Sequence, residues 1–280
     1  MIIHFRKCLL FFFLLFALPV LFTVSCQHKL IYFPRPYPVG FAQEWEKQYP
    51  PSKILRYQTS QGQQSAFLIM PQSAKKPEHL WLICCGNGTL AAEWTEWLDA
   101  GAPKNDAYLL LDYPGYGDCQ GSSTPKRIRE NIAAALPLAA KQCAMSIEDL
   151  KTRGRFLGHS LGCAAALMGA CDYSLPTGIL IAPFTSSMDM AEKMLGLPVG
   201  WVVTHRFDNR ARIKQWIAQN GRQIHIFHSD DDAVIPLKMG QELAVIDPSR
   251  IAITTVPGGG HDALIRLKKH ELYQLMKAAK

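Results

Sequence analysis

The feature that most constrains the fold is a regular alternation of short apolar runs with helical patterns. Six runs have the length and composition of strands: Leu80–Cys85, Ala107–Asp112, Phe156–Leu157, Gly178–Ala182, Ile224–Phe227 and Ile251–Val256. Most of them are apolar throughout, which is expected of strands that are buried on both faces of a parallel sheet. The alternation therefore predicts a doubly wound α/β domain with a mostly parallel sheet.

Two helical patterns accompany these strands. Residues 123–141 include Ser, Thr and Pro125 at a favourable helix start, and Pro137 is expected to bend the far end. Residues 262–280 predict one amphipathic helix with a leucine stripe: Leu264, Leu267, Leu272 and Leu275. The alternation lapses over residues 186–220, where we expect a small helical insertion.

The composition is that of a globular protein and argues against a nucleic-acid partner. Of the 280 residues, 48% are hydrophobic and 19% are charged, and the net charge is +7. The basic residues form no run with interleaved aromatics, so we expect no binding to nucleic acid. A stretch rich in Pro and aromatics predicts an extended linker over residues 27–54, followed by one folded domain over residues 55–280.

The first 26 residues differ in kind from the rest. A short basic start, Arg6 and Lys7, precedes an uncharged apolar run from Cys8 to Ser25. At about 18 residues, this run lies between the length of a secretory signal and that of a membrane span. The sequence Thr-Val-Ser-Cys also resembles a lipoprotein cleavage site with Cys26 as the lipidated residue. A lipoprotein, an uncleaved anchor and a cleaved signal remain open. We expect a membrane-associated protein of the bacterial envelope, with its folded domain outside the cytoplasm.

The cysteines and histidines have no spacing that is typical of a metal site. No Cys-x-x-Cys is present, and His225 and His228 lie three apart on a predicted strand, which sends them to opposite faces. We therefore expect neither a metal nor a cofactor. A disulfide that involves Cys119, Cys143 or Cys171 is left open.

The strongest chemical signal is the sequence Gly-His-Ser-Leu-Gly at residues 158–162. A predicted strand precedes it and a helix of small residues follows, which is the context that exposes a nucleophilic serine. A serine hydroxyl attacks efficiently when a histidine, itself held by an acid, removes its proton. His261 follows the last predicted strand behind three glycines, whereas His270 lies within the C-terminal helix. We expect Ser160 to be the nucleophile and His261 the base.

Together these motifs resemble the α/β-hydrolase superfamily. The resemblance is greatest to membrane-tethered serine hydrolases related to depalmitoylating thioesterases, monoacylglycerol lipases and serine aminopeptidase-like hydrolases, and it covers about residues 55–275. Three further segments support it: "CCGNGT" (Cys84–Thr89), "DYPGYGDCQG" (Asp112–Gly121) and "IAPFTSSMDMA" (Ile181–Ala191). It implies an α/β-hydrolase fold whose helical insertion, at about residues 186–220, follows strand 6.

The acid lies in the run Asp230–Asp232, between a late strand and His261. By itself this run leaves open which of its three carboxylates holds the histidine. The family form is Gly-x-x-Asp-x-x-Val-Pro, and its alignment on Ile235-Pro236 implies that Asp232 is the acid. The other two aspartates are then expected to be turn residues that bond local backbone N–H groups, and their replacement should cost little.

The resemblance also implies an oxyanion hole made of backbone N–H groups. One donor is Leu161, and the other is Asn87, with the adjacent Gly88 as the alternative. Cys85 stands where the family usually has a histidine that supports this loop, so the loop is expected to be held differently here.

The implied reaction is two-step acyl transfer on a small-molecule ester or thioester. An apolar acyl chain, as in a lipid or acylated substrate, is the favoured substrate feature. It rests on the membrane location and on the apolar segment at residues 190–203, which can equally be ordinary core packing. A serine peptidase and a non-catalytic envelope binding protein with this fold are the alternatives, and the oligomeric state is left open.

Overall fold

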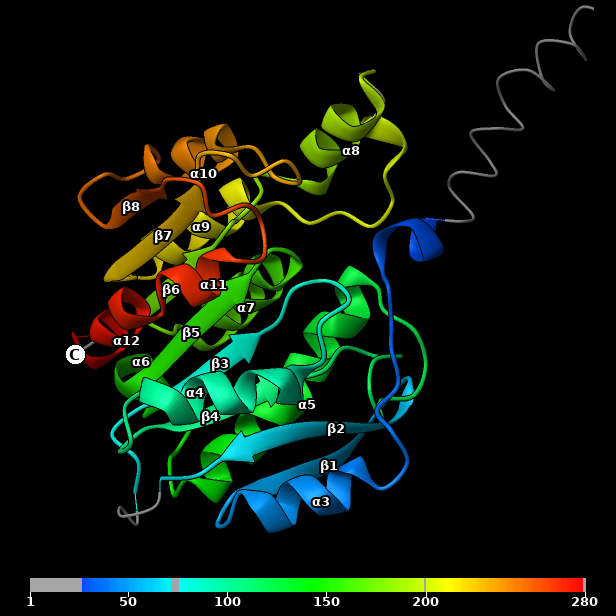
Figure 1. The fold of residues 1–280 in the computed structure, drawn as a ribbon, viewed down its shortest axis with the longest axis vertical. Helices are drawn as coiled ribbons and strands as arrows, with labels where there is room; N and C mark the ends of the chain where they lie inside the picture. Colours follow the sequence, from blue (N-terminus) through cyan, green and yellow to red (C-terminus); the bar gives the residue numbers. More distant parts are fainter. Residues whose placement is uncertain (1–26, 72–75, 199, 279–280) are drawn as a thin grey trace, which may run out of the picture.

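A computed structural model describes residues 27–71, 76–198 and 200–278, and these residues form one eight-stranded sheet (Figure 1). The strands are β1 (Lys53–Thr59), β2 (Gly62–Ile69), β3 (Leu80–Cys84), β4 (Ala107–Leu111), β5 (Gly154–His159), β6 (Thr177–Ile181), β7 (Gln223–Ser229) and β8 (Ile251–Val256). Their order in the sheet is β1-β2-β4-β3-β5-β6-β7-β8. β1–β2 and β2–β4 pair antiparallel, whereas β3 to β8 pair in parallel. The predicted doubly wound, mostly parallel sheet is confirmed.

All six predicted runs form strands, because burial on both faces of the sheet requires continuous apolar sequence. Every residue of β3, β4, β5 and β6 is buried. β1 and β2 were not predicted. β1 lies at the edge of the sheet and carries exposed polar residues among its buried ones, so it lacks an apolar run. Gly62, with φ of 95°, starts β2 directly after the turn that joins the two strands.

Helices cover both faces of the sheet (Figure 1). The named helices of the described chain are α3 (Phe41–Gln48), α4 (Thr95–Gly101), α5 (Pro125–Gln142), α6 (Leu150–Arg153), α7 (Leu161–Tyr173), α8 (Ser187–Leu195), α9 (Asn209–Ala218), α10 (Leu237–Ala244), α11 (Leu264–Leu267), α12 (Lys269–Ala278), and the 3₁₀ turns η2 (Ala91–Trp94) and η3 (Gly200–Val202). α5, α7 and α9 pack in a row on one face. α4 and α12 meet on the other, where Trp97 contacts Tyr273.

The two predicted helical patterns have different outcomes. α5 begins as expected, with the Thr124 hydroxyl accepting a hydrogen bond from a first-turn N–H and Pro125 as the first helical residue. The prediction of a single C-terminal helix was wrong, because non-helical backbone at Lys268 (φ −105°, ψ 17°) separates α11 from α12. Leu267, at the end of α11, is consequently 58% exposed instead of completing the buried stripe.

The segment predicted as an extended linker, residues 27–54, lacks regular structure over residues 32–38 and enters β1 at Lys53. Residues 27–31 are helical, and α3 occupies most of the second half. α3 forms because Trp45 is buried against Phe67 of β2, with 4.8 Å between the ring centroids. The expectation of a wholly extended linker was therefore wrong.

The predicted leader, residues 1–26 with Cys26, lies outside the described residues. Among those that the structure describes, no helix combines the length and the apolar character needed to cross a bilayer. The predicted insertion at residues 186–220 contains two different parts. α8 and η3 project from the domain, whereas α9 packs on α7 like the other helices of the fold (Figure 1).

Candidate active site

Ser160 occupies a sharp turn between β5 and α7. Its φ of 54° and ψ of −121° are a strained conformation for a residue with a Cβ. The N–H of Ser160 donates to the oxygen of Ile181 at 2.9 Å, which ties the turn to β6. A Cβ at Gly158 would meet the backbone of α7, and a Cβ at Gly162 would meet the carbonyl group of Cys84. Only glycines fit at these two positions, and the turn that they permit directs the serine hydroxyl away from the sheet.

The structure brings Ser160, His261 and Asp232 into one hydrogen-bonded chain. His261 follows β8 and Asp232 follows β7. The Nε2 of His261 lies 2.9 Å from the Oγ of Ser160, and its Nδ1 lies 2.7 Å from an oxygen of Asp232. When His261 is neutral with a proton on Nδ1, it donates to the carboxylate and accepts from the hydroxyl. This arrangement allows a serine to lose its proton as it attacks.

Asp232 is held as a carboxylate by several donors. Its second oxygen accepts hydrogen bonds from the N–H groups of Val234 and Ile235 at 2.9 and 2.8 Å. Burial raises the pKa of Asp232, but the hydrogen bond from His261 and these two N–H groups outweigh it, so the pKa is lowered overall. His228, beneath it, is fully buried, and burial lowers its pKa. Asp232 therefore faces a neutral His228 and keeps its charge for His261.

Asp230 and Asp231 bond the loop that carries His261. The Asp230 carboxylate accepts from the N–H of Gly258 at 3.0 Å, and the Asp231 carboxylate accepts from the N–H of Gly260 at 2.7 Å. The N–H of Gly259 donates to the hydroxyl of the neighbouring Ser229 at 2.8 Å. Asp230 and Asp231, together with Ser229, thus fix three successive N–H groups before His261. The expectation of turn residues that bond only their own local backbone was too narrow.

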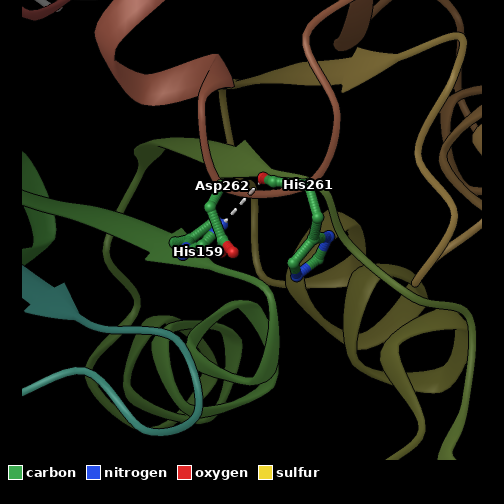
Figure 2. Close-up of side chains that lie close together, drawn as sticks. All are labelled: His159, His261 and Asp262. Atoms are coloured by element: carbon green, nitrogen blue, oxygen red, sulfur yellow. Dashed lines mark hydrogen bonds between the residues drawn. The ribbon is translucent and has the colours of Figure 1, made fainter.

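His159 is a residue of the site for which no role was predicted. It is buried beside Ser160, and its Nε2 donates to the backbone oxygen of His261 at 3.4 Å, while the carboxylate of Asp262 lies close to its ring (Figure 2). Burial, and then the nearby His261, lower the pKa of His159 to about 4. A Cβ at Gly86 would touch its ring. His159 therefore packs between the loop after β3 and the His261 loop as a neutral support.

Two groups of side chains in the described residues have the proximity of metal ligands, but several of their ligand atoms bond other groups. The first is His159, His261 and Asp262, and the second is Glu78, His79 and Asp106. In the first, the ring nitrogens of His261 bond Ser160 and Asp232. In the second, the Asp106 carboxylate accepts from His79 and from the indole of Trp81. The described cysteines, Cys119, Cys143 and Cys171 among them, are free and buried.

The backbone N–H groups of Leu161 and Asn87 flank Ser160 on two elements. Leu161 is the first residue of α7, and Asn87 lies in the loop after β3. Neither N–H donates to another atom of the described chain. Both N–H groups are therefore available to an oxygen atom of a bound molecule.

Tyrosines and the N-terminal segment hold the Asn87 loop. The hydroxyl of Tyr113 donates to the backbone oxygen of Cys85 at 2.8 Å. The side chain of Asn87 donates to the oxygen of Ile31 at 2.6 Å and accepts from the N–H of Phe33 at 3.0 Å. Burial raises the pKa of the Cys85 thiol well above its ordinary value. Cys85 is therefore an inert core residue, and the loop is supported without the family histidine.

Asp112 links this loop to β4. Its carboxylate accepts hydrogen bonds from the N–H of Ala91 and the hydroxyl of Tyr37, each at 2.8 Å. These bonds lower the pKa of Asp112, but burial is the larger effect and raises it from 3.8 to about 7. The folded protein therefore holds a proton on Asp112 that the unfolded chain releases near pH 4. As the pH rises, this difference lowers the free energy of unfolding of the protein.

We expect Asp112→Asn to remove part of the pH dependence of stability. The contribution of Asp112 is fully present below pH 3.8 and is lost as the pH rises to about 7. The unfolding free energy of the wild type should therefore fall relative to that of the variant by up to about 4 kcal/mol over this range. Urea denaturation of both proteins between pH 4 and pH 8 measures the difference. Parallel curves would show that Asp112 ionises normally.

Comparison with known proteins gives the family. A family model described as "Alpha/beta hydrolase family" matches residues 81–225, just over half of the chain. The chain belongs to the alpha/beta hydrolase family. The match of this alpha/beta hydrolase includes the Ser160 turn and ends before Asp232 and His261. Among curated proteins, none matches it.

Solved structures similar to this alpha/beta hydrolase include three bacterial proteins. The esterase domain of a Rhodothermus marinus protein is 17% identical, with a TM-score of 0.58 and coverage of 81% of this chain and 98% of that one. An alpha-beta hydrolase from Vibrio vulnificus is 14% identical, with a TM-score of 0.64 and coverage of 87% and 88%. S-formylglutathione hydrolase from Staphylococcus aureus is 12% identical, with a TM-score of 0.56 and coverage of 81% and 98%. At these identities the similarity is one of fold.

Proposed function

We propose that this alpha/beta hydrolase is a serine hydrolase that cleaves ester or thioester bonds through an acyl-enzyme. The observation that carries the proposal is the continuous chain of hydrogen bonds from Asp232 through His261 to Ser160. Ser160 attacks the carbonyl carbon while His261 takes its proton, and His261 then returns a proton to the leaving group. Water, activated by the same histidine, releases the acyl group.

The negative charge that develops on the carbonyl oxygen needs fixed donors. We assign this role to the backbone N–H groups of Leu161 and Asn87. Their lack of another acceptor in the described chain supports the assignment. The anchoring of Asn87 by Ile31 and Phe33 keeps its N–H in place before substrate arrives, so no reorganisation is needed during the reaction.

Esters and thioesters with an acyl chain are the proposed substrates. The names of two solved structures of this fold, an esterase domain and S-formylglutathione hydrolase, are consistent with this class. The apolar run at Cys8–Ser25 supports a location at a membrane of the bacterial envelope, where acyl groups are abundant.

Labelling with a fluorophosphonate tests the proposed nucleophile. The purified chain should react at Ser160, identified by mass spectrometry of the modified peptide, and should hydrolyse short p-nitrophenyl esters. Ser160→Ala should abolish both the label and the turnover, with circular dichroism as the control for folding. Absence of both reactions in the folded wild type would refute the enzyme and leave a non-catalytic binding protein. A panel of esters, thioesters and aminoacyl amides ranks the substrate classes, and preference for the amides would instead indicate a peptidase.

A further inference from the structure

The projecting part of the domain exposes apolar side chains that a soluble core would bury. No residue of α8 is buried, and the large side chains at its C-terminal end and in η3 are open to solvent. The exposed fractions are 72% for Met194, 59% for Leu195, 60% for Leu197 and 65% for Trp201. Figure 1 shows α8 standing away from the sheet and its helices. These residues are therefore not core packing, and such a group of exposed apolar residues is typical of an interaction surface.

The same surface lies where the apolar leader joins the domain. Gln27, one of the first described residues, is buried, and its amide donates to the oxygen of Val202 at 2.6 Å. Its amide oxygen accepts from the N–H of Thr204 at 2.7 Å. The uncharged run of residues 8–25 thus ends two residues before a point that is fixed beside Trp201.

Two more exposed apolar residues follow in the N-terminal segment, and both parts of the surface are attached to active-site loops. Leu30 is 60% exposed and Phe33 is 57% exposed. The backbone N–H of Phe33 donates to the side chain of Asn87 at 3.0 Å. On the other side, the ammonium group of Lys193 in α8 donates to the oxygen of Val234 at 3.0 Å, in the loop that carries the proposed acid.

We propose that six residues form a lipid-docking face: Leu30, Phe33, Met194, Leu195, Leu197 and Trp201. This face lies on the bilayer that receives the apolar leader, and it presents the two loops beside Ser160 to the membrane surface. The occupant is a lipid bilayer because an apolar segment of about membrane-spanning length ends at this face, whereas a second copy of the chain would have to share it with that segment. The choice of acyl chains as substrate rests on the proposed function, but the docking itself does not.

Tryptophan fluorescence tests the docking directly. The chain has six tryptophans, of which Trp201 is 65% exposed, whereas Trp97 is partly buried and the other four are buried. The full chain is reconstituted in vesicles of phosphatidylcholine and phosphatidylglycerol, with or without brominated acyl chains. We expect brominated lipid to quench part of the emission, Trp201→Phe to remove most of this quenching, and Trp97→Phe, the matched control, to leave it unchanged. Equal quenching in the wild type and in Trp201→Phe would overturn the proposal.

A second measurement separates docking from catalysis. We expect Leu195→Ser combined with Leu197→Ser to leave turnover of soluble p-nitrophenyl acetate unchanged and to lower turnover of an acyl ester held in the vesicles by at least about tenfold. Val245→Ser, at an exposed apolar residue of another element, is the control and should change neither rate. A wild type inactive on both substrates but quenched by brominated lipid would refute the proposed function and support the docking. A detergent-soluble dimer that the double substitution dissociates would assign the face to a second copy and overturn the proposal.

Discussion

Replacing Asp232 with Asn is expected to lower the turnover of a p-nitrophenyl ester by about 10⁴-fold. The carboxylate oxygen 2.7 Å from His261 holds the ring with its proton on Nδ1 and stabilises the positive charge that the ring acquires. If the amide of the substituted Asn donates to Nδ1, the His261 ring must carry its proton on the other nitrogen, so it cannot accept from Ser160. If the amide oxygen faces Nδ1 instead, it stabilises the positive charge of the ring less than a carboxylate does. The other oxygen still accepts from Val234 and Ile235, so the fold should be retained. Steady-state kinetics and near-ultraviolet circular dichroism measure the two effects separately.

The neighbouring aspartates provide the matched controls. Asn at position 230 or 231 keeps an oxygen that can accept from Gly258 or Gly260, so Asp230→Asn and Asp231→Asn should each lower turnover by no more than about threefold. Asp231→Ala removes that acceptor and should cost more than Asp231→Asn, through misplacement of His261. Near-normal turnover of the Asp232→Asn protein would overturn the assignment of the acid.

The largest loss of stability is expected from Gly162→Ala. A Cβ at this position would lie far inside contact distance of the backbone carbonyls of Cys84 and Cys85. Because these atoms belong to the end of β3 and the loop that follows it, no side-chain rotation can relieve the clash. We expect the free energy of unfolding to fall by more than about 3 kcal/mol, at the upper end of overpacking costs. Chemical denaturation gives the value, and loss of soluble protein would be the extreme form of the same result.

Gly169→Ala is the control for this substitution, since it makes the same change in the same helix. The three atoms nearest to its Cβ all belong to the side chains of Leu82 and Ile132, and the nearest is the end of the Leu82 side chain. The higher helix propensity of alanine should offset part of the repacking, so we expect a change within about 1 kcal/mol. Equal stability of the two variants would show that the Ser160 turn tolerates a larger residue.

The sequence predicts the parallel strands β3 to β8 better than the antiparallel strands β1 and β2. Strands such as β3 and β4 are apolar throughout, so burial alone identifies them, and the positions of Ser160 and His261 follow from their places after strands. β1 was missed because it is an edge strand of mixed polarity. The exposure of Met194 and Trp201 could not be predicted either, since an apolar stretch has the same sequence whether it packs in a core or faces outward.

The supporting residues of the site were the hardest to predict. His159 is the variable position of the Gly-x-Ser-x-Gly sequence, so its type carried no signal, and its bond joins the end of β5 to a loop 102 residues away. The bonds from Asp230 and Asp231 span 28 and 29 residues and likewise depend on the meeting of β7 and β8. Turn chemistry read from neighbouring residues cannot reveal such partners.

The bonds between residues 229–231 and the glycines at 258–260 have a consequence for protein engineering. The two loops form one rigid unit, because three hydrogen bonds fix the spacing between them. A graft that moves the His261 loop into another scaffold must include residues 229–231. Without them, the loop loses the hydrogen bonds that position the imidazole. Directed evolution of either loop should accordingly recover paired substitutions, one in residues 229–231 and one in residues 258–260.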